Sequence, residues 1–80
     1  MDLRILRQHE VMAERHVASA EIRVGRMRDL IARLEAEGHD VAPEIEFLKT
    51  LERALTDHMA DLDKVRKQLS QAAQGKKRQR

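Results

Sequence analysis

The sequence predicts an all-α protein, an antiparallel helical hairpin that dimerises into a four-helix bundle. Three observations lead to this prediction: apolar residues recur at alternating steps of three and four, one short segment breaks the pattern, and the composition suits exposed helices. The 80 residues carry 38% charged side chains but one aromatic ring, three Gly and one Pro. Such a composition is typical of long, solvent-exposed helices, and the length allows one domain.

The first helix is expected over residues 2–37. Its apolar positions alternate by three and four, which is the seam of a left-handed coiled coil or helical bundle, whereas a strand would alternate by two. Glu10 is the single polar residue in this seam. The seam positions are Leu3, Leu6, Glu10, Ala13, Val17, Ala20, Val24, Met27, Ile31 and Leu34.

The break is expected at residues 38–41. Gly38 can adopt the left-handed conformation that closes a helix. Asp40 can accept hydrogen bonds from free amides at the start of the next helix, and Pro43 suits a first helical turn, where its missing N–H is not needed. A connection this short makes the two helices antiparallel.

The second helix is expected over residues 42–72, followed by a basic flexible tail at 74–80. Its seam contains one polar residue, His58, among Leu48, Leu51, Leu55, His58, Leu62, Val65 and Leu69. Pairing outward from the turn places Val24 near His58 and Ala20 near Leu62. A buried polar side chain needs a hydrogen-bond partner, so His58 is either a structural residue that sets register or a pH switch that loosens the bundle.

The apolar surface is wider than one seam. Phe47 and Ala54 flank one side of the second seam, while Ile45 and Met59 flank the other. A hairpin of this size without disulfides or metal buries little, so we expect two copies to pair with two-fold symmetry. The alternative is a lone hairpin whose flanking apolar residues are ordinary exposed ones. The predicted dimer and core seam comprises Leu6, Ala13, Val17, Ala20, Val24, Met27, Ile31, Leu34, Phe47, Leu48, Leu51, Leu55, His58, Leu62, Val65 and Leu69.

Charge is segregated along the chain although the net charge is only +2. Residues 35–63 carry −7, residues 64–80 carry +7 and residues 1–34 carry +2, so a hairpin has an acidic turn and a basic open end. The basic end either compensates the helix dipole, attracts the acidic end of a second copy, or contacts nucleic acid or another polyanion. The candidate polyanion contacts are Arg4, Arg7, Lys64, Arg66, Lys67, Lys76, Lys77, Arg78 and Arg80.

Catalysis is not expected. The chain has no Cys and no Gly-rich phosphate loop, and Ser19 and Ser70 have no His and acid at a suitable spacing. The only metal candidates are His9, Glu10 and His16, which share one edge of the first helix and would need further ligands from a partner chain. The sequence therefore predicts neither a cofactor nor a metal.

Several segments together resemble a group of short, uncharacterised bacterial helical-hairpin proteins. The resemblance covers about residues 9–69, and it implies a helical hairpin without a known activity. The chain departs from the group's pattern at Ala20, where a Gly often precedes the Glu, and at Pro43. The segments are Ala13-Glu14-Arg15-His16-Val17-Ala18, Glu21-Ile22, Leu30-Ile31-Ala32-Arg33-Leu34-Glu35, Gly38-His39-Asp40, Leu51-Glu52 and His58-Met59-Ala60-Asp61.

The function expected from the sequence is that of a self-associating, non-catalytic module for protein–protein interaction or scaffolding. Nucleic-acid or polyanion binding through the basic open end is the alternative. No stretch approaches 18 apolar residues and no charged-then-apolar leader is present, so we expect neither a membrane span nor a secretory signal. The expected location is the cytoplasm.

Overall fold

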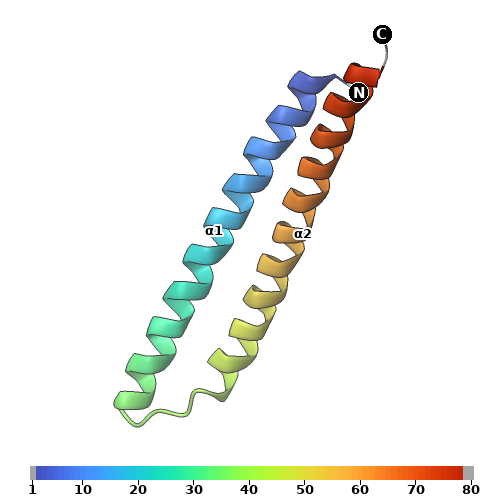
Figure 1. Ribbon diagram of the computed structural model, residues 1–80. Coiled ribbons are helices and arrows are strands. Elements are labelled where there is room, and N and C mark those ends of the chain that lie inside the picture. The colour runs from blue at the N-terminus through green and yellow to red at the C-terminus, as the bar shows by residue number, and fades with distance from the viewer. Residues whose placement is uncertain (1, 79–80) are drawn as a thin grey trace.

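The computed structural model describes the backbone of residues 2–78 and the side chains of residues 2–74. In this range the chain forms two helices and no strand: α1 spans Leu3–Ala36 and α2 spans Ala42–Arg78. The helices lie side by side and antiparallel, with both chain ends at one end of the molecule (Figure 1). The prediction of an all-α helical hairpin is confirmed.

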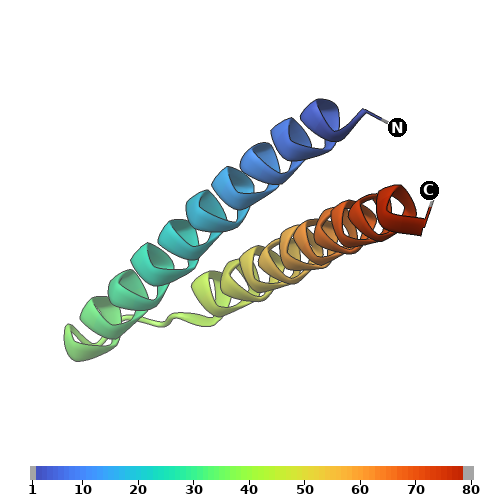
Figure 2. The same cartoon turned by 45° about the horizontal axis from the view of Figure 1, so that its top comes forward.

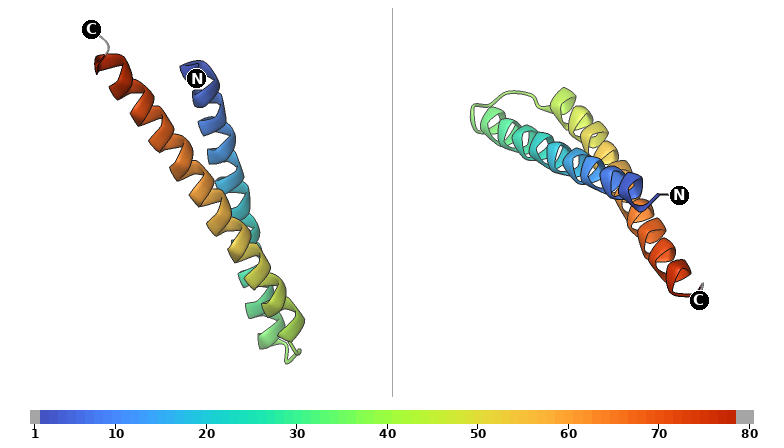
Figure 3. Two further views of the ribbon diagram at one scale, coloured as in Figure 1. Left: turned by 90° about the vertical axis from the view of Figure 1, so that its right-hand side faces the viewer. Right: turned by 90° about the horizontal axis from the view of Figure 1, so that it is seen from above.

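The molecule is elongated because no third element covers the helix pair. Its principal extents are 67 × 15 × 13 Å, and its radius of gyration is 18.5 Å. A compact domain of this length would have a radius of gyration of about 12 Å. Figures 2 and 3 show that the two helix axes are inclined to each other and cross. The core is therefore a narrow strip along one side of each helix.

The end of α1 follows from the conformation of Gly38, whose φ is +82°. The His39 N–H donates to the Leu34 carbonyl at 2.9 Å, and the Gly38 N–H donates to the Glu35 carbonyl at 3.0 Å. These two bonds form a Schellman motif, which satisfies carbonyls that the helix end would otherwise leave free. The expected role of Gly38 as the helix-closing residue is confirmed.

The start of α2 is held by Asp40 and Val41. A carboxylate oxygen of Asp40 accepts from the Ala42 N–H at 3.1 Å, as expected from the sequence. The Val41 carbonyl accepts from the Ile45 N–H at 2.9 Å, which is the first bond of the helix. Val41 itself is 8% exposed and joins the core. We did not predict this role, although Val41 stands seven residues before Leu48 and so continues the seam.

Replacing each of two glycines by alanine is expected to change the unfolding free energy in opposite directions. The Gly38→Ala variant should lose about 1–2 kcal/mol of unfolding free energy, because a side chain is strained at positive φ. Gly25→Ala is the matched control, since Gly25 lies within α1 and a Cβ there meets nothing within 4 Å. It should gain about 0.5–1 kcal/mol. Urea unfolding measures both changes, and equal signs would contradict the assigned backbone conformation.

The predicted end of the second helix was wrong. α2 continues to Arg78 rather than ending at 72, so most of the predicted tail at 74–80 is helical. Gln, Ala, Lys and Arg are good helix formers, and Gly75 alone costs about 1 kcal/mol. Basic residues near a helix C-terminus are also favoured by the helix dipole. Gln79 and Arg80 lie outside the described residues.

The core consists of the seam residues. Among residues 2–74, those exposed by 9% or less are Leu6, Ala13, Ala20, Val24, Ile31, Val41 and Leu62. The remaining seam positions are half-buried, namely Leu3, Glu10, Val17, Met27, Leu34, Leu48, Leu51, Leu55, His58, Val65 and Leu69. Two of the seven buried residues are Ala, so the hairpin encloses little apolar volume. Neither helix contains, within residues 2–78, an apolar stretch that could span a bilayer.

The predicted register between the helices was wrong by about one helical turn. Ala20 lines the same hollow as His58, and the His58 ring pairs with His16, which is eight residues before the predicted partner Val24. The prediction centred the pairing on Val41. The connection between α1 and α2 comprises residues 37–41 and is centred on His39, which shifts the partner of every α1 residue along α2.

Candidate interaction surface

The seam of α1 has two flanks with different properties. Arg28 and Leu30 are two residues apart, which is about 200° around the helix, so they lie on opposite flanks. Arg28 reaches Glu52 of α2 on one flank, while Leu30 lines a groove together with Phe47 of α2 on the other. We call the first the ion-paired flank and the second the open flank.

Three ion pairs bridge the helices along the ion-paired flank. An Arg28 Nη donates to a Glu52 Oε at 2.8 Å. Arg66 donates from Nε to Glu10 at 3.4 Å and from Nη to Glu14 at 3.1 Å. These side chains are between 29% and 61% exposed, so each pair contributes about 0.2–1 kcal/mol, and together they favour one register.

The sequence held a signal for these pairs that we did not use. Glu14 precedes Arg28 by fourteen residues on α1, and Glu52 precedes Arg66 by fourteen residues on α2. Because the helices are antiparallel, the first residue of the pair on α1 lies opposite the second residue of the pair on α2, and the reverse. Each carboxylate therefore meets a guanidinium. Residues fourteen apart share one face of a helix in a coiled coil. This spacing would have predicted both the ion-paired flank and the register.

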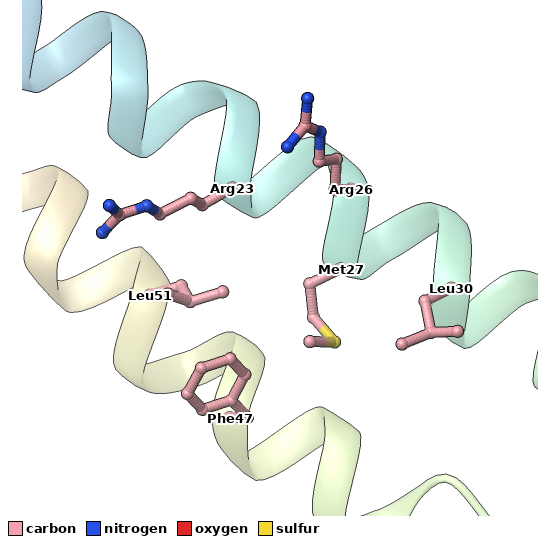
Figure 4. A pocket seen from close by; sticks show the side chains of 6 residues that line it. All are labelled: Arg23, Arg26, Met27, Leu30, Phe47 and Leu51. Carbon is pink, nitrogen blue, oxygen red and sulfur yellow. The ribbon is translucent and has the colours of Figure 1, made fainter.

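The open flank carries an apolar groove near the connection. Met27 and Leu30 of α1 and Phe47 and Leu51 of α2 line it together with Arg23 and Arg26 of α1, and its volume is about 390 Å³. The apolar side chains lie in the space between the helices, and no ion pair closes that side of the described chain (Figure 4). Phe47 is 52% exposed although it is the largest apolar side chain of the protein. Phe47 therefore belongs to this surface and not to the hairpin core.

Farther along the same flank, at mid-length of the hairpin, lies a smaller polar hollow of about 160 Å³. The His16 and His58 rings pack against each other at its edge, with centroids 5.3 Å apart and an interplanar angle of 47°. Its other lining residues are Ser19, Ala20, Arg23, Leu51 and Ala54. The sequence singled out both histidines but did not predict that they meet.

The three metal candidates are directed to different partners. Glu10 accepts from Arg66, and the His16 ring faces His58. His9 is exposed and lines a different surface hollow, together with Val11 and Met12. Within residues 2–74, no group of three or more His, Asp or Glu side chains could hold a metal ion. The structure thus does not assemble His9, Glu10 and His16 into one site.

Several candidate polyanion contacts are engaged with carboxylates. Arg4 lies 3.6 Å from Asp2, and Lys67 lies 3.0 Å from Asp63. Arg66 holds the two carboxylates of the ion-paired flank. The remaining described candidates, Arg7 and Lys64, are exposed. The side chains of Lys76, Lys77 and Arg78 and all of Arg80 lie outside the described part of the chain.

The fold and its surface define a two-helix hairpin with one ion-paired flank and one open, partly apolar flank. No family model matches the chain, and no curated protein or solved structure is significantly similar to it. The function is therefore inferred from the geometry and chemistry of this surface.

Proposed function

We propose that the protein is a non-catalytic interaction or scaffold module, and that it self-associates through its open flank into a four-helix bundle. The observation that carries the proposal is the exposed area. The chain exposes 6487 Å². A compact folded monomer of 9.3 kDa exposes about 5,000 Å². A stable interface takes about 800 Å² from each partner, so the surplus of about 1,500 Å² is ample for one.

The open flank supplies the contiguous apolar surface that such an interface needs. Met27 and Leu51 are seam positions, Leu30 and Phe47 flank the seam, and Arg23 and Arg26 border these apolar side chains. A second hairpin laid on this flank extends the seam into the core of a bundle, in which each helix touches two neighbours. The other exposed apolar side chains of the described chain do not line this groove, namely Ile5, Val11, Met12, Ile22, Ile45 and Met59.

The charge distribution favours one orientation of the second copy. Residues 35–63, at the connection, carry −7, and residues 64–80, toward the open end, carry +7. A two-fold axis perpendicular to the helices places the acidic half of one copy against the basic half of the other. An axis parallel to the helices brings like charges together. The perpendicular axis is therefore favoured electrostatically, with screening by salt.

Sedimentation equilibrium over a dilution series tests this proposal. We expect a mass of twice 9.3 kDa that falls toward 9.3 kDa on dilution. Added salt should promote dissociation, because the orientation rests partly on exposed charges. A helical particle of 9.3 kDa at every concentration would contradict self-association.

Polyanion binding at the open end is the second candidate. The observation in its favour is that both chain ends lie together, which joins the basic segments at 1–7 and 64–78 (Figure 1). Arg4, Arg66 and Lys67 are already paired with carboxylates, and the chain has no Trp or Tyr for base stacking. Deletion of residues 74–80 tests it: duplex binding that survives both this deletion and added salt would contradict the candidate.

A further inference from the structure

We propose that the hollow lined by the contacting His16 and His58 rings, Ser19 and Arg23 binds a small oxyanion, either inorganic phosphate or the phosphate group of a larger metabolite. The hollow lies on the open flank at mid-length of the hairpin and is lined by both helices. All of its lining residues belong to one hairpin, and the flank on which it lies is also the one proposed for self-association.

The geometry of α1 gathers three polar side chains on one face. His16, Ser19 and Arg23 are separated by three and four residues, which makes them neighbours on the helix surface. His58 of α2 completes the hollow, with its ring centroid 5.3 Å from that of His16. A volume of about 160 Å³ exceeds the roughly 30 Å³ that one water occupies, so a tetrahedral anion fits.

All four polar side chains can donate hydrogen bonds to an anion. Arg23 carries five N–H donors in a planar fork that matches phosphate oxygens, and Ser19 carries a hydroxyl. An imidazole has one N–H donor even when it is uncharged. His16 and His58 can therefore both donate without a change of protonation. Bonds from a guanidinium to an oxyanion are among the stronger hydrogen bonds in proteins.

The charges around the hollow leave Arg23 available for an external anion. No carboxylate lines the hollow, and Arg23 forms no ion pair with any of residues 2–74. Its side chain extends from α1 toward α2, close to Leu51 (Figure 4). The carboxylates of Glu14 and Glu52 lie on the ion-paired flank, held by Arg66 and Arg28, whereas Asp61, seven residues after Ala54, follows the open flank but does not line the hollow.

A transition metal is the competing ligand for two facing imidazoles. Zinc sites in proteins use three or four protein ligands, and the hollow offers no third His, Asp or Glu. The Arg23 guanidinium would also repel a cation. The donor set and the charge of the hollow therefore favour an anion.

Phosphate titration followed by NMR of the imidazole signals tests the proposal. At constant ionic strength, inorganic phosphate should cause saturable shifts at His16 and His58 but not at His9 or His39, the two histidines outside the hollow. Arg23→Gln should weaken binding about tenfold, the value of one charge-assisted hydrogen bond.

The matched control is Arg26→Gln, because Arg26 lies one turn from Arg23 but does not line the hollow. We expect unchanged phosphate affinity in this variant. Equal losses in the two variants would show general electrostatic attraction and overturn the proposal. Saturable shifts at His16 and His58 with zinc but not with phosphate would also overturn it. Tighter binding of glycerol phosphate than of inorganic phosphate would support a metabolite as the ligand, and equal binding would support free phosphate.

The same titration in the Phe47→Glu variant keeps the two proposals distinguishable. Phe47 lines the apolar groove but not the hollow. Phosphate binding is expected to persist in this variant. Loss of binding there, with binding intact in the wild type, would show that the hollow is incomplete in a single hairpin and would overturn the claim that one hairpin suffices.

Discussion

Phe47→Glu is expected to convert the protein from a dimer to a monomeric hairpin. Phe47 is 52% exposed in the hairpin, so the substitution removes little from the hairpin's own core. In the bundle, the new carboxylate would replace the apolar contacts of the ring with Met27, Leu30 and their counterparts, and it would lose water although Arg23 and Arg26 line the same groove. The lost burial of a Phe side chain costs about 2 kcal/mol, which weakens dimerisation about thirtyfold. Sedimentation equilibrium measures the change, and circular dichroism should show that the helices persist.

Met59→Glu is the matched control for this prediction. Met59 is 54% exposed, also lies on α2, and takes the same substitution. It is spaced seven residues from both Glu52 and Arg66, so it follows the ion-paired flank. The Met59 variant should therefore remain dimeric. If both variants dissociate equally, the interface lies elsewhere on the hairpin. If both variants remain dimeric, the interface does not include the open flank.

Leu62→Ala is expected to lower the unfolding free energy by about 2–3 kcal/mol. Leu62 is 9% exposed and is the only residue of the described side chains of α2 that is buried to this extent. Removing it leaves a cavity that the two helices cannot close without losing register. A core of this size supplies only about 3–5 kcal/mol in total, so the variant should keep less than half of its stability and unfold at a lower temperature. Urea unfolding at a fixed protein concentration gives the value, since dimerisation stabilises by mass action.

Leu69→Ala makes the same chemical change at a half-buried seam position nearer the open end. We expect a loss of about 1 kcal/mol there, because less of the removed side chain is taken out of water. A loss at Leu69 equal to that at Leu62 would show that the seam is uniformly packed. It would contradict a core concentrated on a few buried positions.

The elements of the fold could be predicted from short-range features. The spacing of apolar residues identified both helices, and Gly38 and Asp40 identified the connection, because helix-closing and helix-capping bonds involve residues only a few positions apart. The end of α2 was missed because the apolar pattern fades before 72 while helix propensity continues to Arg78. The periodicity of apolar residues indicates where a helix packs against a partner, and the helix itself can continue beyond that region.

The candidate sites were predicted less completely. The sequence singled out Phe47, His16 and His58 as residues, but not the groove or the hollow to which they belong. Both features form where α1 and α2 meet, and a register error of one turn changes every pair of facing residues. The metal hypothesis for His9, Glu10 and His16 considered one helix alone. The structure shows that α2 supplies different partners to Glu10 and His16.

The sequence by itself determined which side of each helix is apolar, since side-chain direction in a helix repeats every 3.6 residues and needs no partner. It also determined the antiparallel arrangement, through a connection of five residues between α1 and α2. Only the tertiary structure decided the axial offset of the helices, and hence which flank is closed by ion pairs and which stays open. That offset depends on where the connection is centred and on contacts between residues far apart in the chain, which no local pattern specifies.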